Sequence, residues 1–92
     1  MESILSNEKE CYICHKTQAL HKHHIFFGTA NRKISEQYGC WCWLCYEHHN
    51  GSSRGVHFNI ALDRMLKKEA QKRFEGIYGH KEYMRQIGRS YL

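Results

Sequence analysis

Three short stretches of the sequence concentrate side chains that can bind metal ions or move protons. They are CYICH (11–15), LHKHHIFFG (20–28) and CWCWLCYEHHNG (40–51), and together they hold all five cysteines. Thiolates and imidazoles are the ligands that Zn²⁺ takes in structural and catalytic sites. Imidazole also exchanges protons near neutral pH. The sequence therefore has to be interpreted for metal binding and for acid–base chemistry.

The five cysteines favour a metal site over a disulfide framework. An odd number pairs poorly, and no apolar run near the N-terminus resembles a secretory signal, so a cytoplasmic, reducing location is expected. A chain of 92 residues also buries too little apolar surface to be comfortably stable on its core alone. A bound metal is the better source of the missing stability.

Two ligand sets are compatible with the spacing of the cysteines. Cys11-x-x-Cys14 has the spacing of a zinc knuckle, and its partner pair is either Cys42 with Cys45 or Cys45 with His48. Residues three apart on a strand face opposite sides, so an extended strand through Cys45 separates it from Cys42. This favours a three-cysteine, one-histidine site. The predicted structural zinc ligands are Cys11, Cys14, Cys45 and His48.

The remaining cysteines and two redox motifs have simpler interpretations. Cys40 and Cys42 are then expected to be small, half-buried residues. CYICH also matches the signature for covalent haem attachment, but nothing directs export and both histidine pairs would stay unexplained. A thioredoxin-like pair is disfavoured because no βαβ pattern surrounds it.

The sequence also contains two pairs of adjacent histidines, His23–His24 and His48–His49, close to the predicted zinc ligands. His23 and His24 are adjacent on a predicted strand, so their side chains are expected to face opposite ways. One of them can hold a metal ion while the other acts as a base on a nearby water. His49 directly follows the predicted ligand His48 and is expected to point back toward His23.

The elements that must position these residues form an α+β domain. The pattern predicts strands over 20–27 and 41–45, a short helical turn around 32–38, a long helix from about Val56 to Gly76 or Gly79, and a last helix over 81–87. No linker or repeat divides the chain, so residues 1–92 are expected to be one domain. No stretch is apolar enough to predict a membrane span.

The charge balance favours a polyanionic partner such as DNA. The formal net charge is +5, and residues 64–92 carry eight Lys or Arg against three glutamates. Such a basic segment can contact the duplex backbone without reading sequence. The predicted phosphate contacts are Arg32 or Lys33, Arg54, Lys67 and Arg85. Solvated surface charge is the alternative for each of them.

In their order and spacing, CYIC, HKHHI and LCYEHHN resemble the HNH (His-Me finger) endonucleases, in particular small phage-type, recombination-associated members. The resemblance implies a zinc-stapled ββα-metal core over about 11–57, followed by a helical extension over about 58–92. It also implies metal-dependent hydrolysis of DNA phosphodiester bonds. One such site cuts one strand, so nicking is expected, and double-strand cleavage would need a homodimer or two visits.

The same resemblance assigns roles to individual histidines. It implies that His23 and His49 bind the catalytic ion, that His24 is the general base, and that His57 is an additional ligand. The asparagine that usually precedes the second knuckle has no counterpart, because Cys40 or Trp41 occupies its place.

A catalytic site of imidazoles suits Zn²⁺, Ni²⁺ or Mn²⁺ better than Mg²⁺, which prefers carboxylates and water. A catalytically inactive, zinc-stapled nucleic-acid-binding module is the alternative function. A structural zinc protein that binds another protein is a third, but it leaves His23, His24 and His49 without a role.

Overall fold

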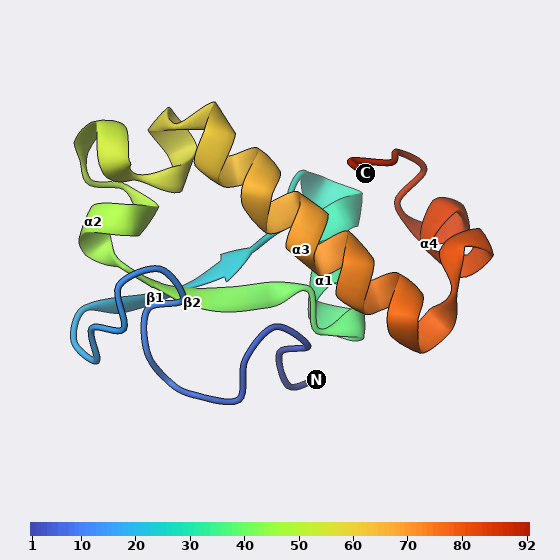
Figure 1. Ribbon diagram of the computed structural model, residues 1–92, viewed down its shortest axis with the longest axis horizontal. Coiled ribbons are helices and arrows are strands. Elements are labelled where there is room, and N and C mark those ends of the chain that lie inside the picture. Colours follow the sequence, from blue (N-terminus) through green and yellow to red (C-terminus); the bar gives the residue numbers. More distant parts are fainter.

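The computed structural model describes residues 1–92, the side chain of Ser52 excepted, and has the expected α+β class (Figure 1). Two 3-10 turns, at Ser52–Arg54 and Val56–Phe58, join the central elements to the long helix. The remaining elements are β1 (Leu20–His24), α1 (Thr29–Tyr38), β2 (Trp41–Cys45), α2 (Tyr46–His49), α3 (Ile60–Tyr78) and α4 (His80–Gln86). None of the described helices has the length and hydropathy that a membrane-crossing helix requires.

The two strands form one antiparallel pair in which Leu20 lies opposite Cys45 and His24 lies opposite Trp41. β2 has the predicted bounds, whereas β1 ends at His24, three residues earlier than predicted. The backbone of Phe26 bonds to a helix instead of a strand. Its N–H donates to Ser35 Oγ at 3.1 Å, and the same hydroxyl donates to the Phe26 carbonyl at 2.7 Å. These bonds connect the end of β1 to α1.

α1 is longer than the predicted helical turn and ends at a glycine that the fold requires. Gly39 has a φ of 74°, in the left-handed region, and its N–H bonds to the carbonyl of Ser35. A Cβ at this position would also collide with the carbonyl oxygen of Glu2. Only glycine combines this dihedral with so close a backbone approach. The turn returns the chain directly into β2.

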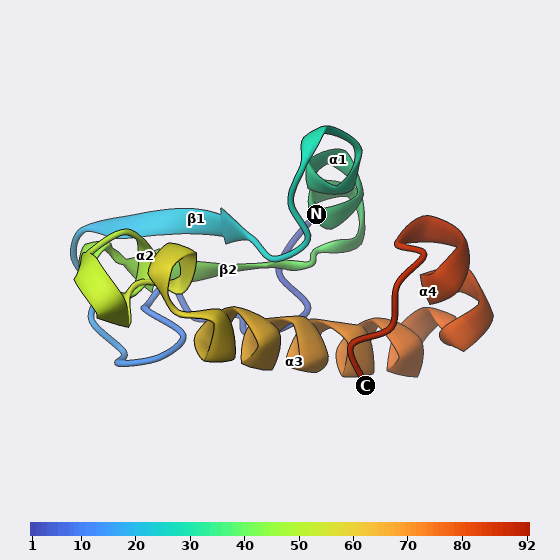
Figure 2. The same ribbon diagram turned by 90° about the horizontal axis from the view of Figure 1, so that it is seen from above.

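α3 begins at Ile60, later than the predicted start near Val56, because Asn59 caps it. The Asn59 side-chain oxygen accepts a hydrogen bond from the N–H of Leu62 at 3.1 Å. Figure 2 shows α3 running along one side of the sheet, with α4 turning back at its far end. The helix continues through Gly76 and ends at Tyr78, before Gly79 with its φ of 90°. The expected apolar stripe is buried at Leu66, Ala70 and Phe74, whereas Phe58, Met65 and Ile77 are exposed.

Tyr83 fixes α4 against the rest of the protein. Its ring is fully buried and lies edge-on to Phe26 and Phe74, with centroids 5.8 and 5.5 Å away. Its hydroxyl donates to the carbonyl of Arg89 at 2.6 Å. The predicted packing of Tyr83, Met84 and Ile87 onto the domain is confirmed, because the latter two are partly buried against the same core.

Lys67, predicted to contact DNA, is instead a buried cation of α3. Its side chain retains 11 % exposure, its Nζ lies 2.8 Å from Asp63 Oδ2, and the same Nζ lies 4.3 Å from the centroid of Phe27. The i,i+4 spacing brings the carboxylate into reach, and the ring covers the ammonium. Lys67 is therefore not part of an exposed basic face.

Replacing Lys67 is accordingly expected to affect folding. Lys67→Gln leaves the nearly buried Asp63 carboxylate without its cation and should lower the free energy of unfolding by roughly 2–4 kcal/mol. The exposed neighbour Lys68 provides the matched variant, and Lys68→Gln should stay within about 0.5 kcal/mol of wild type. Urea unfolding of the three proteins measures both values. Equal stability of the two variants would contradict a structural role for the Lys67–Asp63 pair.

Candidate metal centre and active site

The predicted zinc ligands come together at one end of the molecule. The ligand atoms of Cys11, Cys14, Cys45 and His48 all lie within 4.8 Å of one another and could hold a metal ion. Cys45 Sγ lies 3.7 Å from Cys14 Sγ and 3.3 Å from His48 Nδ1. A tetrahedral ion with Zn–S bonds of about 2.3 Å and a Zn–N bond of about 2.0 Å separates its ligands by about 3.5–3.8 Å. The spacing fits such an ion.

Local backbone bonds shape the knuckle that carries the first two ligands. The N–H of Cys11 bonds to the carbonyl of Lys16, and the N–H of His15 returns to the carbonyl of Cys11, at 2.8 and 2.9 Å. His15 accepts a positive φ of 67° in this turn. The N–H of Tyr12 bonds to the carbonyl of Trp43, which ties the knuckle to β2. The sheet and the knuckle thus present their thiols to the same point.

The surroundings of the knuckle favour a metal-binding thiolate at Cys11. Burial alone would raise the pKa of this thiol, but hydrogen bonds from the backbone N–H groups of Cys45, Cys14 and Ile13 lower that pKa to about 6. At Cys14 a backbone bond from Lys16 favours the thiolate. Burial and the neighbouring sulfur atoms outweigh it and raise the pKa of Cys14. A cation between the sulfurs would relieve their mutual repulsion.

Cys40 and Cys42 stay outside this cluster. Both are fully buried, more than the half-buried environment expected for them, and burial raises the pKa of each thiol to about 12. Cys42 lies opposite His23 in the sheet, three residues before Cys45. The alternation of the strand thus keeps Cys42 away from the knuckle, as the sequence argument required.

A second cluster consists of His23, His49 and His57, whose ligand atoms also lie within 4.8 Å of one another. The Nε2 atoms of His49 and His57 are 3.2 Å apart. Among the described side chains, His23 Nε2 is a buried polar atom with no hydrogen-bond partner. A buried imidazole nitrogen without a partner is costly, and a metal ion at the centre of the three rings would satisfy it.

The same environment favours the neutral form of two of these rings, His23 and His49. Burial, followed by the neighbouring histidines His49 and His57, lowers the pKa of His23 to about 3. Burial, His57 and His21 lower the pKa of His49 to about 4. Neutral imidazoles have a free lone pair for a cation. The donor set therefore fits a divalent ion that accepts nitrogen ligands.

His21 belongs to this cluster although the sequence argument did not single it out. Its Nδ1 lies 2.9 Å from His49 Nδ1, and the two ring centroids are 5.0 Å apart. A metal ligand commonly uses its second ring nitrogen in a hydrogen bond that orients it. The available signal was the spacing of two between His21 and His23, which places both on one face of a strand.

His24 lies on the opposite face of β1 from His23, as predicted. Its Nε2 lies 2.7 Å from Glu36 Oε2 on α1, and Glu36 Oε1 lies 2.7 Å from Lys22 Nζ. Hydrogen bonds from Lys22 and His24 lower the pKa of the Glu36 carboxyl. Glu36 is twelve residues from His24 in sequence, and no local pattern indicated this contact.

Side chains from both faces of β1 border one open cavity of about 570 Å³. His24 and the three clustered histidines lie in its wall. Three cations, Lys22, Arg32 and Lys33, also line it. The cavity therefore brings the predicted base, the three clustered histidines and positive charge to one place.

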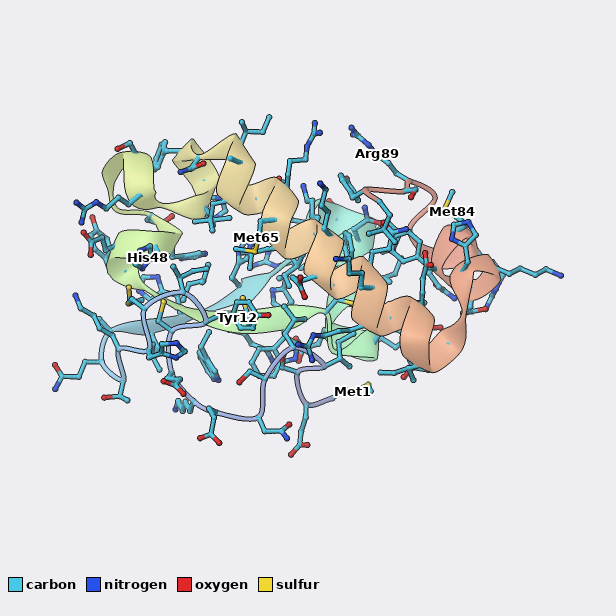
Figure 3. The ribbon with its side chains drawn as sticks, in the orientation of Figure 1. Met1, Tyr12, His48, Met65, Met84 and Arg89 are labelled. Atoms are coloured by element: carbon cyan, nitrogen blue, oxygen red, sulfur yellow. The ribbon has the colours of Figure 1, made fainter. Side chains whose placement is uncertain are left out.

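The predicted phosphate contacts divide into two groups. Arg32 lines the cavity, whereas Arg54 pairs with Glu47 at 2.9 Å beyond it. Arg85 makes two hydrogen bonds to Glu82, at 2.9 and 2.7 Å. Figure 3 shows His48 toward one end of the long axis and Met84 toward the other, with Arg89 between the middle of the molecule and Met84. Arg85, on α4, is therefore far from the cluster of Cys11, Cys14, Cys45 and His48.

The chain was also compared with known proteins. No family model, curated protein or solved structure matches it.

Proposed function

We propose that this protein is a metal-dependent DNA endonuclease of the HNH type, which hydrolyses phosphodiester bonds and nicks one strand. The main support is the shared cavity, in which His24 faces the same space as His23, His49 and His57. The separate Cys11, Cys14, Cys45 and His48 cluster supports a structural metal beside it. The resemblance implies one structural zinc site and one separate catalytic metal site. A thiol-rich cluster and an all-imidazole cluster are consistent with these two roles.

The two clusters would hold ions of different character. Three thiols and one imidazole suit a closed tetrahedral Zn²⁺ with a structural role. The three imidazoles leave coordination positions open and favour Zn²⁺, Ni²⁺ or Mn²⁺ over Mg²⁺. When bound there, such an ion stabilises negative charge on the phosphate and on the leaving oxygen.

The chain itself would supply the proton transfer and the binding of the phosphate. His24 takes a proton from the attacking water. This proton transfer requires a base with an unprotonated nitrogen. Arg32 and Lys33 offset the charge of the phosphates that flank the scissile bond. His23 and His49 would hold the ion, because their ligand atoms lie within 4.8 Å of each other and of that of His57.

A plasmid-nicking assay tests the proposal. Supercoiled DNA is incubated with protein that carries its structural metal and with one added ion at a time: Zn²⁺, Ni²⁺, Mn²⁺ or Mg²⁺. Conversion to the open circle is expected with the first three ions and at most weakly with Mg²⁺. DNA binding without nicking under any ion would overturn the nuclease and leave the inactive binding module. Linear product at high protein concentration would indicate that both strands are cut, either by a homodimer or by two successive visits.

Phosphate binding in the cavity gives a second expected result. Arg32→Gln/Lys33→Gln removes two cations and should flatten the dependence of log affinity on log salt by about two units, because each phosphate contact releases about one counterion. The reduction should be the same on unrelated duplex sequences. Fluorescence anisotropy at several salt concentrations measures the slope.

The matched variant for this measurement is Lys81→Gln/Arg85→Gln. It removes the same charge from α4, at the far end of the molecule. Its slope should stay close to that of wild type. If instead the α4 variant alone flattens the slope, DNA lies along the C-terminal helices and not over the cavity.

A further inference from the structure

We infer that Glu36 is the positioning residue for His24: its carboxylate accepts a hydrogen bond from Nε2–H and so leaves Nδ1 as the unprotonated nitrogen that can act as the base. This inference rests on the proposed nuclease function for its catalytic meaning. The contact itself is a property of the folded chain. No residue near His24 in sequence performs this task.

The geometry of the contact fixes which nitrogen of His24 carries the proton. Glu36 Oε2 lies 2.7 Å from His24 Nε2, a short distance typical of a charge-assisted hydrogen bond. An ionised carboxylate has no proton to give, so Nε2 must be the donor. In a neutral imidazole the other nitrogen, Nδ1, then has a free lone pair. That lone pair is what a general base requires.

Glu36 is held at both of its oxygens. Lys22, which shares the outward face of β1 with His24, donates to Oε1 at 2.7 Å. The Lys22 ammonium in turn lies 4.2 Å from the centroid of the Trp41 ring. The carboxylate is therefore bridged between two side chains of one strand. This arrangement restricts its rotation and gives His24 a fixed acceptor.

The helix that carries Glu36 is anchored by its neighbour. Ser35 is fully buried, and its hydroxyl bonds to both backbone groups of Phe26, two residues after His24. The distance between α1 and the end of β1 is thus set by hydrogen bonds independent of Glu36 itself. Substituting Glu36, whose side chain is 46 % exposed, should leave this anchor intact.

Kinetics of matched variants test the role. Glu36→Ala should lower kcat for nicking by about 10–100-fold with little change in KM, the cost commonly seen when a supporting partner is removed. Glu36→Gln retains an acceptor oxygen and should recover part of the rate. Lys22→Gln removes the other partner of Glu36 and should have the smallest effect. Thermal melts of all three verify that each variant is folded.

A double-mutant cycle separates positioning from a general structural effect. If Glu36 acts through His24, adding Glu36→Ala to His24→Ala should cause no further loss of rate. A loss that multiplies in the double variant would overturn the inference. So would a Glu36→Ala protein that nicks at the wild-type rate.

Nitrogen-15 NMR of the assigned His24 ring gives a test that does not require activity. At a pH where the His24 ring carries a single proton, wild type should show the Nε2–H form. Glu36→Ala should show a mixture of the two neutral forms. An Nδ1–H form in wild type would overturn the inference whatever the nuclease assay gives. The expected form in a protein that fails to nick would overturn only the proposed function.

Discussion

Cys11→Ser is expected to leave a protein that is unfolded or aggregated and carries no structural metal. Cys11 is fully buried, and its thiol is one of the four predicted zinc ligands, with Cys14, Cys45 and His48. Binding of structural zinc provides about 10–16 kcal/mol of apparent free energy in small domains. That is comparable with the whole stability of a typical domain, about 5–15 kcal/mol. A site that loses one thiolate cannot retain most of this stabilisation.

Cys40→Ala is the control for this experiment, since Cys40 is equally buried but lies outside the cluster. It should retain one equivalent of zinc and a cooperative melt. Metal content by mass spectrometry and circular dichroism melts, with and without a chelator, measure the difference. One equivalent of zinc in a stable Cys11→Ser protein would contradict the ligand set.

His24→Ala should abolish nicking while the fold and the metal content stay close to wild type. A positioned general base contributes about 10²–10⁴ to the rate, and His24 is outside both metal-type clusters. His80→Ala is the matched control, because this exposed histidine pairs only with Glu75 near the far end of α3. Initial rates on supercoiled DNA, with equal metal loading, provide the comparison. Wild-type nicking by His24→Ala would show that another group is the base.

His23→Ala should differ from His24→Ala in a measurable way. Its Nε2 is the buried, unpartnered atom at the centre of the histidine cluster. Removing it should weaken binding of the second ion as well as nicking, whereas the structural metal stays bound. Calorimetric titration with Ni²⁺ or Mn²⁺ distinguishes the two variants. Unchanged affinity for the second ion in His23→Ala would contradict its assignment as a ligand.

The sequence was most informative where alternation on a strand determined the outcome. The opposite facing of Cys42 and Cys45 favoured the ligand set that the structure brings together, and the opposite facing of His23 and His24 is present in β1. Both expectations depend on the period of two that a strand imposes regardless of its surroundings. Which of the two histidines would bind an ion and which would act as the base was implied by the resemblance alone. β2 has the bounds predicted for it.

The sequence was least informative where a contact joins distant segments. Glu36 and Lys67 look like ordinary surface charges, yet one meets His24 from another element and the other is covered by Phe27. Of the two glycines expected to end α3, Gly79 follows its last residue, whereas the helix passes through Gly76. A glycine inside a helix costs only about 1 kcal/mol, which the packing of residues such as Phe74 outweighs.

The pairing of Leu20 with Cys45 connects the cluster of Cys11, Cys14, Cys45 and His48 to the register of the sheet. This pair stands at the end of the sheet where Cys45 joins the cluster of Cys11, Cys14 and His48, and the register of every later pair follows from it. A slip of one residue would exchange the two faces of β1. His23 would then point toward Glu36, and His24 toward His49. A metal held at Cys45 would therefore fix the register of the two strands. The register in turn determines that His23 faces the histidine cluster and that His24 faces Glu36.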